Sequence, residues 1–248
     1  MVVLVNKKKY MDINKEFPVD TQTTYVDKIA IATVKNILKD NKKEYTYCEI
    51  GSFLGGSLAP FLMDDNCVDI LSIDERNRRQ PDERGAKFDY GGITHQTMID
   101  NLLKHNLKVD KLRTFDGSIN DYNGDEKFDL IFIDGEHTDY ACFRDFIYCV
   151  KFLKSPSIVM FHDSNLVYKS LKIIQELLNS NKAEYKFIKV KNSSVSFIFF
   201  GEFIKYHSMF EIEENLEQFY INSESEILNE VIKNRVSFNV NYKINDIL

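Results

Sequence analysis

Residues 45–57 read Tyr-Thr-Tyr-Cys-Glu-Ile-Gly-Ser-Phe-Leu-Gly-Gly-Ser, and they decide the fold class of this chain. The first six residues are mostly apolar or aromatic and predict a buried β-strand. The three glycines that follow predict a tight turn, and the apolar run Leu58–Met63 predicts a helix. In α/β proteins this order of strand, glycine-rich turn and helix brings backbone N–H groups close to a nucleotide-like ligand.

The glycine spacing G-x-x-x-G-G differs from the G-x-G-x-x-G of dinucleotide-binding proteins. This departure disfavours an NAD dehydrogenase and indicates another adenosine ligand. Glu49 directly precedes the turn, so we expect its carboxylate to reach into the ligand crevice.

Strand and helix patterns alternate from about residue 24 to about residue 200. Strands are predicted at Tyr45–Ile50, Val68–Ile73, Lys111–Phe115, Phe128–Ile133, Ser157–Phe161, Tyr185–Val190 and Val195–Phe200. Helices are predicted at Tyr25–Leu38, Leu58–Met63, Thr94–His105, Tyr140–Leu153 and Ser164–Leu178. Apolar strands between amphipathic helices predict an α/β fold with a doubly wound, mostly parallel seven-stranded sheet and one antiparallel edge strand.

Two segments depart from this alternation. The polar segment Glu75–Gly92 is too long for a plain turn, so it is predicted to be either a functional loop or disordered. Residues 1–200 form the predicted α/β domain, and residues 201–248 form an acidic C-terminal extension. Helical patterns cover Met209–Phe219 and Glu224–Lys233 of this extension, and Asn-rich extended sequence follows. We expect it to pack on the core or on a partner, which is compatible with a homodimer.

The composition is that of an ordinary globular protein, with 44% hydrophobic and 28% charged residues among 248. A formal net charge of −6 argues against a nucleic-acid partner, because phosphate binding needs clustered Lys and Arg. The four cysteines contain no C-x-x-C pair and are typical of buried residues in a reduced, cytoplasmic protein. No apolar run approaches the roughly 20 residues of a membrane-spanning helix, so no membrane partner is expected.

Polar residues follow each of the next four predicted strands as well. Asp74 closes the second strand, where it can accept both hydrogens of a ribose diol, and Asp116-Gly117-Ser118 follows the third strand, where it could contact a purine edge. Asp134-Gly135-Glu136-His137 follows the fourth strand and His162-Asp163-Ser164 the fifth. In open α/β sheets, ligands bind outside the carboxyl ends of the strands.

Taken singly, each of these residues has a structural interpretation. Asp74 could start a loop, Asp134 and Asp163 could cap helices, and the two histidines could be ordinary buried residues. Matched polar groups at five strand ends nevertheless favour one ligand-binding crevice.

Four runs together resemble the class I S-adenosylmethionine-dependent methyltransferases: residues 49–57, Ser-Ile-Asp at 72–74, Phe-Asp-Leu-Ile-Phe-Ile-Asp-Gly-Glu-His at 128–137, and Val-Met-Phe-His-Asp-Ser at 159–164. The most similar branch includes small-molecule and sugar O-methyltransferases with an Ile-Asp-Gly-x-His signature. The resemblance covers about residues 25–200. It implies a Rossmann-like methyltransferase fold, S-adenosylmethionine (SAM) as cofactor, and O-methylation of a hydroxylated small molecule such as a sugar or glycan precursor.

Carried over by position, the resemblance assigns cofactor binding to Glu49, Gly51, Ser52, Gly55, Gly56, Ser57, Asp74, Asp116, Gly117, Ser118 and Asp134. The turn would wrap the methionine part and ribose, Asp74 would hold the ribose hydroxyls, and Asp116 and Ser118 would lie near adenine. Metal-dependent relatives bind a divalent cation at the positions of Asp134, His162 and Asp163. The His-Asp pair departs from the usual two oxygen donors and would suit Mn, Fe or Zn better than Mg.

Methyl transfer to oxygen requires removal of the acceptor's proton. His137 or His162 is the expected base, or a metal at Asp134 and Asp163 would lower the pKa of the hydroxyl. The acceptor pocket is expected between Glu75–Gly92, the segment Phe17–Tyr25 and the loops after strands four and five.

Four arginines in the polar segment have two readings. Arg76, Arg78, Arg79 and Arg84 are either a solvated loop or the contact for a phosphorylated or nucleotide-linked sugar. Two other functions stay open for the chain: a metal-dependent oxygenase or hydroxylase-like enzyme that uses the same His and Asp residues, and a non-catalytic protein that binds the adenosine ligand. Metal analysis separates the first, and ligand binding without methyl transfer separates the second.

Overall fold

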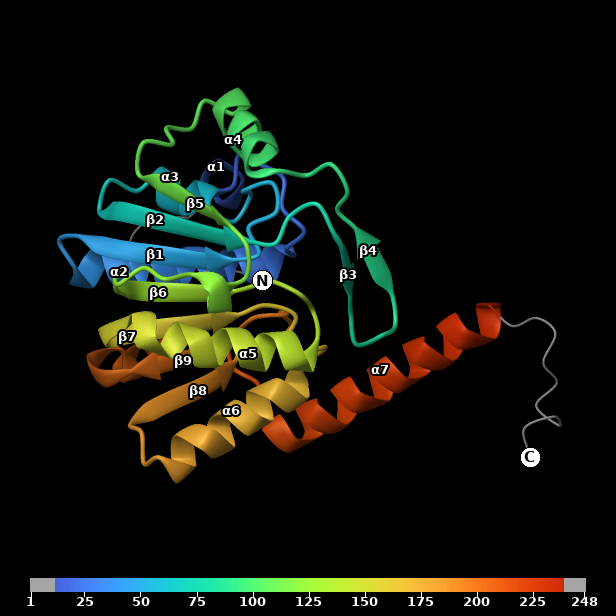
Figure 1. The fold of residues 1–248 in the computed structure, drawn as a ribbon. Helices are drawn as coiled ribbons and strands as arrows, with labels where there is room; N and C mark the ends of the chain where they lie inside the picture. Colours follow the sequence, from blue (N-terminus) through green and yellow to red (C-terminus); the bar gives the residue numbers. More distant parts are fainter. Residues whose placement is uncertain (1–11, 239–248) are drawn as a thin grey trace, which may run out of the picture.

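The computed structural model describes residues 12–238. Within them, a seven-stranded sheet has the order β5-β2-β1-β6-β7-β9-β8 (Figure 1). Its strands are β1 (Tyr45–Ile50), β2 (Cys67–Asp74), β5 (Leu112–Asp116), β6 (Phe128–Ile133), β7 (Leu153–Phe161), β8 (Tyr185–Lys189) and β9 (Ser196–Phe200). Strands β5, β2, β1, β6 and β7 pair in parallel, whereas β9 pairs antiparallel with both β7 and the edge strand β8. The doubly wound, mostly parallel sheet predicted from the sequence is confirmed.

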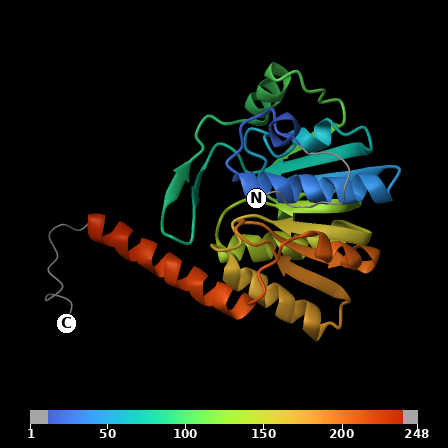
Figure 2. The same cartoon turned by 180° about the vertical axis from the view of Figure 1, so that it is seen from behind.

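Helices cover both faces of the sheet (Figures 1 and 2). The α-helices are α1 (Ile13–Glu16), α2 (Tyr25–Asn41), α3 (Ala59–Leu62), α4 (His95–Lys104), α5 (Asp139–Cys149), α6 (Tyr168–Ser180) and α7 (Leu216–Phe238). Three 3-10 helices are described: η1 (Ile119–Asp121), η2 (Val150–Phe152) and η3 (Gly201–Met209). Helices α2 and α3 pack on one face and α5 and α6 on the other, so two separate apolar cores form.

Strand β1 shows how the sequence fills both cores. Successive side chains of a strand point to opposite faces. Tyr45 and Tyr47 therefore enter the core beneath α2, where Tyr47 stacks on Phe61 with ring centroids 3.8 Å apart. Cys48 and Ile50 enter the core beneath α5. Burial on both faces explains why the strand is apolar apart from the partly buried Thr46 and the buried Glu49.

The segment Glu75–Gly92, predicted to be either a functional loop or disordered, contains regular secondary structure. It forms a β-hairpin of β3 (Arg79–Pro81) and β4 (Lys87–Asp89), which projects beyond the sheet (Figure 1). The buried Asp82 organises its turn, since its carboxylate accepts hydrogen bonds from the backbone N–H groups of Arg84 and Ala86. Such side-chain-to-backbone bonds stabilise turns that show no hydrophobic periodicity.

The prediction of two short helices in the C-terminal extension is wrong. Residues 201–209 form η3, and α7 then runs without a break from Leu216 to Phe238. The chain contains no Gly or Pro between residues 202 and 238 that would end this helix. Its first turns pack on α6, where the amide of Gln175 donates to the hydroxyl of Tyr220 at 2.7 Å. The predicted Asn-rich extended end lies outside the described residues.

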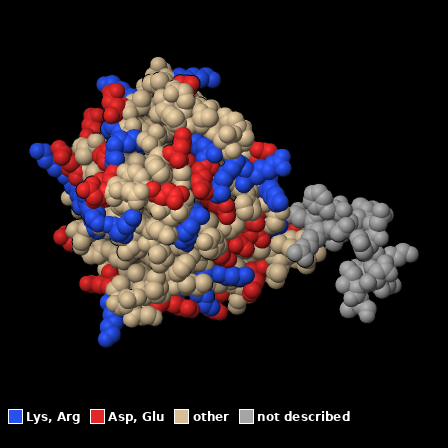
Figure 3. Space-filling view, in the orientation of Figure 1, with Lys and Arg blue, Asp and Glu red and all other residues tan. Residues whose placement is uncertain are grey.

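Charged side chains of both signs lie on the surface of the molecule. On the face seen in Figure 3, Lys and Arg side chains are interspersed with Asp and Glu rather than gathered into one broad basic patch. Across residues 12–238, no helix combines the length and the apolar character needed to cross a membrane.

Gly51 provides a test of how tightly the strand ends pack. We expect Gly51→Ala to lower the free energy of unfolding by roughly 2–5 kcal/mol, because alanine is disfavoured at its φ of +88° and an added Cβ would lie 2.0 Å from the Asp134 carbonyl oxygen. Gly85→Ala is the matched control. Its φ is +75° but nothing lies within 4 Å of the added Cβ, so about 1–2 kcal/mol is expected. Urea unfolding measures both, and equal losses would contradict the prediction.

Candidate active site

A cavity of about 260 Å³ opens at the carboxyl ends of β1, β2, β6 and β7. Its walls are the glycine turn after β1, the segment before α2, the β3–β4 hairpin, and the residues that follow β6 and β7. Backbone hydrogen bonds that continue beyond the strands hold these ends together: Gly51 N–H donates to Ile73 O, Asp134 N–H to Ile50 O, and His162 N–H to Ile133 O. The carboxyl edge of the sheet therefore fixes the relative positions of the polar residues predicted there.

The glycine turn forms one wall of the cavity. It is closed by a hydrogen bond of 2.7 Å from Gly55 N–H to Ser52 O, and it packs against the segment before α2 so closely that a Cβ on Gly56 would lie 2.3 Å from the Asp20 carbonyl oxygen. Among the described residues, the buried hydroxyl of Ser52 has no hydrogen-bond partner. Because buried polar groups normally have one, this hydroxyl is suited to a ligand in the cavity.

Asp74 lies where the sequence predicts it, at the end of β2 and in the wall of the cavity. One carboxylate oxygen accepts a hydrogen bond of 2.8 Å from Phe53 N–H, which ties the acid to the glycine turn. Burial raises the pKa of Asp74, although the nearby Arg76 acts in the opposite direction.

Glu49 does not line the cavity, so the prediction that it reaches into the crevice is wrong. Its side chain lies on the same face of β1 as Tyr47 and is fully buried beneath the turn. There it accepts hydrogen bonds from the hydroxyls of Tyr47 and Ser57. Burial raises its pKa to about 8, and the negative charges of Asp134 and Asp74 add to this effect. Glu49 therefore supports the turn from below through Ser57.

The residues predicted near adenine separate into two groups. Asp116 is half-exposed and lies outside the cavity, where it pairs with Arg76 at 3.0 Å and with His95 at 2.7 Å. Gly117 and Ser118 line a smaller adjoining cavity of about 20 Å³, which shares Gly51 and Asp74 with the larger one and so extends it.

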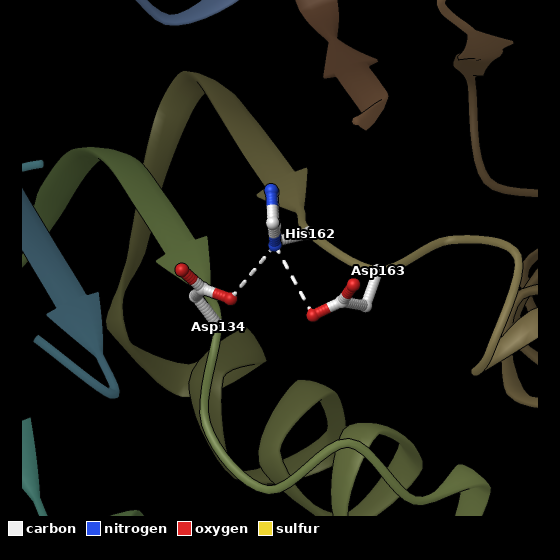
Figure 4. A group of neighbouring side chains, drawn as sticks. All are labelled: Asp134, His162 and Asp163. Carbon is white, nitrogen blue, oxygen red and sulfur yellow. Dashed lines mark hydrogen bonds and ion pairs between the residues drawn. The ribbon is translucent and has the colours of Figure 1, made fainter. Parts of the chain in front are cut away.

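Asp134, His162 and Asp163 converge at the ends of β6 and β7, as Figure 4 shows. Nδ1 of His162 lies 3.2 Å from a carboxylate oxygen of Asp134 and 3.2 Å from one of Asp163. One ligand atom from each of the three residues falls within 4.8 Å of the others, as a cation site requires. Asp163 has a φ of +47°, an unfavourable backbone conformation of the kind that clusters at functional sites. Neither aspartate caps a helix, since Thr138 and Val167 occupy the N-cap positions of α5 and α6.

Neighbouring charges and burial shift the pKa values of His162 and Asp163 in opposite directions. Burial alone would lower the pKa of His162, but Asp134, Asp163 and Asp27 around the ring raise it well above its ordinary value. Burial would raise the pKa of Asp163, and the hydrogen bond from His162 lowers it instead.

His137 has a more open position than His162. It is half-buried and lines the cavity, with Nε2 3.1 Å from the Asp163 carboxylate. A histidine that faces a cavity and is oriented by a carboxylate has the arrangement of a general base.

Both segments predicted beside the acceptor pocket, Glu75–Gly92 and Phe17–Tyr25, contribute residues to the cavity wall. The sequence did not identify which of their residues would do so. The hairpin contributes an aromatic wall in which Phe88 and Tyr90 lie near the rings of His137 and Phe53, with centroids 6.3 Å and 5.3 Å apart. Unlike the other members of the predicted site, these side chains lie outside the strands predicted from the sequence and belong to no motif, so no signal in the sequence pointed to them.

The four arginines have different surroundings, so neither reading applies to all of them. Arg76 and Arg84 line the cavity, and each also pairs with a carboxylate. Arg78 is bound to Glu75 and Glu136, and the exposed Arg79 pairs with Asp89 on the hairpin.

Residues 48–164 match the model of a family described as a methyltransferase domain. No curated protein matches the sequence. The matched segment begins in β1 and ends directly after His162 and Asp163, so it contains most of the cavity wall.

Solved structures support the same fold. The O-methyltransferase NovP aligns with a TM-score of 0.55 at 11% identity, over 70% of this chain and 79% of its own. The calicheamicin methyltransferase CalS11 aligns with a TM-score of 0.53 at 14% identity, over 71% and 79%. An O-methyltransferase from Bacillus cereus, determined with SAH, aligns with a TM-score of 0.51 at 12% identity, over 79% and 93%. At these identities the likeness establishes the fold.

The pH dependence of stability should reveal the buried Glu49. Its folded-state pKa of about 8 exceeds the ordinary value of 4.5, so the stability that its protonated form contributes is complete below about pH 4.5 and is lost as the pH rises through about 8. Glu49→Gln keeps the side chain neutral at all pH values. We therefore expect the wild type to lose stability relative to this variant between about pH 5 and pH 8, measured by urea unfolding. Parallel pH curves for the two proteins would show that Glu49 ionises normally.

Proposed function

We propose that this chain, a class I SAM-dependent methyltransferase, methylates a hydroxyl oxygen of a small molecule. The observation that carries the proposal is the meeting of three elements at one cavity: the glycine turn, Asp74, and His137 oriented by Asp163. The structural neighbours NovP and the Bacillus cereus protein are O-methyltransferases, which supports oxygen as the acceptor atom.

The residues of the larger cavity fit SAM. In this proposal the backbone of the turn and the free Ser52 hydroxyl bind the methionine part, Asp74 accepts from the ribose hydroxyls, and the smaller cavity at Gly117 and Ser118 takes the adenine edge. When bound, SAM supplies an already activated methyl group. The chain's own task is then to align the acceptor and to accept its proton.

His137 is the residue that we assign to proton removal. The Asp163 carboxylate orients its Nε2, and its half-buried position lets the ring reach an acceptor hydroxyl in the cavity. His162 is less suited because Asp134, Asp163 and Asp27 surround its two ring nitrogens. We assign His162 to holding the two aspartates in place.

Asp134, His162 and Asp163 also fit a divalent cation. The three side chains offer one nitrogen and two oxygen ligands, which suits Mn, Fe or Zn. A cation held there would lower the pKa of the acceptor hydroxyl. A metal-dependent oxygenase would use the same ligands, but the match of residues 48–164 to a methyltransferase domain favours methyl transfer.

The acceptor in this proposal is a phosphorylated or nucleotide-linked sugar. The aromatic side chains of the hairpin offer stacking surface, and the Arg84 guanidinium in the cavity wall offers an anion contact. We include a homodimer through α7 in the proposal, supported by the exposed Ile221, Leu228 and Ile232, and the mass of the protein in solution tests it.

Binding of S-adenosylhomocysteine, the demethylated product, tests the cofactor assignment. We expect the wild type to bind it in calorimetry and Asp74→Ala to weaken binding about 10- to 100-fold, because hydrogen bonds to a charged group contribute about 1.5–3 kcal/mol. Asp69→Asn is the control, since this carboxylate lies at the opposite end of the same strand. No heat with the wild type would refute the proposed function.

A kcat and KM comparison separates the base from the acceptor contact. We expect His137→Ala to lower kcat about 10²- to 10⁴-fold, the usual contribution of a general base. Arg84→Ala should instead raise the KM for a phosphorylated acceptor and leave kcat nearly unchanged. Steady-state rates with hydroxylated acceptors, with and without phosphate, measure both effects. Full activity of His137→Ala would remove the base assignment, and an unchanged KM for Arg84→Ala would remove the phosphate contact.

A further inference from the structure

A buried carboxylate lies behind His162, on the side away from Asp134 and Asp163. Asp27 belongs to the first turn of α2 and is only 1% exposed. It does not line the cavity, and it is 135 residues away from His162 in the sequence. Its carboxylate nevertheless lies 3.4 Å from Nε2 of His162.

Two separate segments hold the Asp27 carboxylate. Its Oδ1 accepts hydrogen bonds from Ser193 Oγ at 2.6 Å and from Ser194 N–H at 2.7 Å, both in the turn between β8 and β9. Its Oδ2 accepts from the N–H and the hydroxyl of Thr24 at 2.8 and 2.7 Å. The same turn is fixed to the end of β7, because Ser164 N–H donates to Ser194 O at 2.9 Å. The position of the carboxylate relative to the histidine is therefore set from both sides.

This placement gives the two ring nitrogens of His162 different roles. With a carboxylate acceptor behind it, Nε2 carries a proton and donates. Nδ1 then faces the two aspartates in front, each 3.2 Å away. Metal-binding histidines commonly have this arrangement, in which a carboxylate behind the ring fixes its orientation and tautomer.

We propose that Asp27 is a positioning residue that orients His162 by accepting a hydrogen bond from its Nε2–H, so that Nδ1 is presented to a divalent cation between Asp134 and Asp163. The inference rests on the cation site of the proposed function. It adds a residue from outside the matched methyltransferase segment, since α2 precedes residue 48.

A purely structural role for Asp27 is the competing explanation. Asp27 and Thr24 form a capping box at the start of α2, and loss of such a cap destabilises a helix. Thr24→Ala removes the capping hydroxyl but leaves the Asp27 carboxylate beside His162, so it is the matched control. Asp27→Asn keeps the size of the side chain and removes the charged acceptor.

Mn²⁺ titration of the full chain is the first measurement. We expect Asp27→Asn to weaken Mn²⁺ binding about 10- to 100-fold, and Thr24→Ala to bind Mn²⁺ like the wild type while it unfolds at a lower temperature. Both variants should bind S-adenosylhomocysteine like the wild type. Equal Mn²⁺ affinities for Asp27→Asn and Thr24→Ala would overturn the proposal.

A ring-proton NMR signal tests the same inference without metal or turnover. The wild type and Thr24→Ala should show an exchange-protected Nε2 proton of His162, which is identified by its loss in His162→Gln. Asp27→Asn should lose this signal. A wild-type spectrum without an Nε2 proton would overturn the proposal even if Asp27→Asn failed to fold.

Measurements of Mn²⁺ binding and S-adenosylhomocysteine binding also distinguish a failure of this proposal from a failure of the proposed methyltransferase function. A wild type that binds S-adenosylhomocysteine but no Mn²⁺ would overturn the proposed cation site and, with it, the presentation of Nδ1 to a cation. The NMR signal would then decide only whether Asp27 orients the ring. Failure to bind S-adenosylhomocysteine would instead refute the methyltransferase proposal.

Discussion

The close approach of the backbone at Gly51 to the backbone at Asp134 is the constraint on which the site depends. A Cβ at position 51 would lie 2.0 Å from the Asp134 carbonyl oxygen, so only glycine permits the turn after β1 to pass so near the end of β6. This contact places the glycine turn, which would hold a cofactor, beside the first acid of the His-Asp cluster. The distance between the glycine turn and the His-Asp cluster therefore follows from backbone packing at the sheet edge, whereas the loops set what else can enter the cavity.

The parts of the fold that could be predicted are those whose local pattern agrees with their tertiary surroundings. Strands β1 and β6 begin and end where the sequence predicts, because both are buried on each face and their mostly apolar runs stop at Gly51 and Asp134. The sequence predicts that helix α5 reaches Leu153, but α5 ends at Cys149, η2 covers Val150–Phe152 and β7 begins at Leu153. The boundary was misplaced because apolar residues suit a buried strand as well as a helix. The order of the sheet then brought Asp74, Asp134, His162 and Asp163 to one edge, as the topology rule requires.

The residues that were missed depend on contacts between distant segments. The hairpin shows no periodic pattern, and it is held in place partly by bonds to the start of α5: Glu83 N–H donates to His137 O, and the Glu83 carboxylate accepts from Asp139 N–H. Asp27 was not singled out from the sequence, and in the structure it forms a capping box with Thr24 at the start of α2. Its contact with His162 arises because β9 turns back beside β7 and brings Ser193 and Ser194 toward the start of α2. No local signal records such a juxtaposition.

Negative charge is concentrated around the cavity. Asp74, Asp134 and Asp163 lie in its wall and Asp27 lies behind it, while the cationic groups in the wall are already bound to carboxylates. Like charges held close together in a partly buried site repel, so this arrangement costs stability in the absence of a positively charged ligand. A sulfonium and a divalent cation both carry compensating charge, and each would stabilise the folded form in proportion to its binding. Around Asp74, Asp134 and Asp163, the electrostatics of the cavity and the geometry of the His-Asp cluster therefore both favour a cation, whereas Arg84 places a positive charge on the hairpin side of the same cavity.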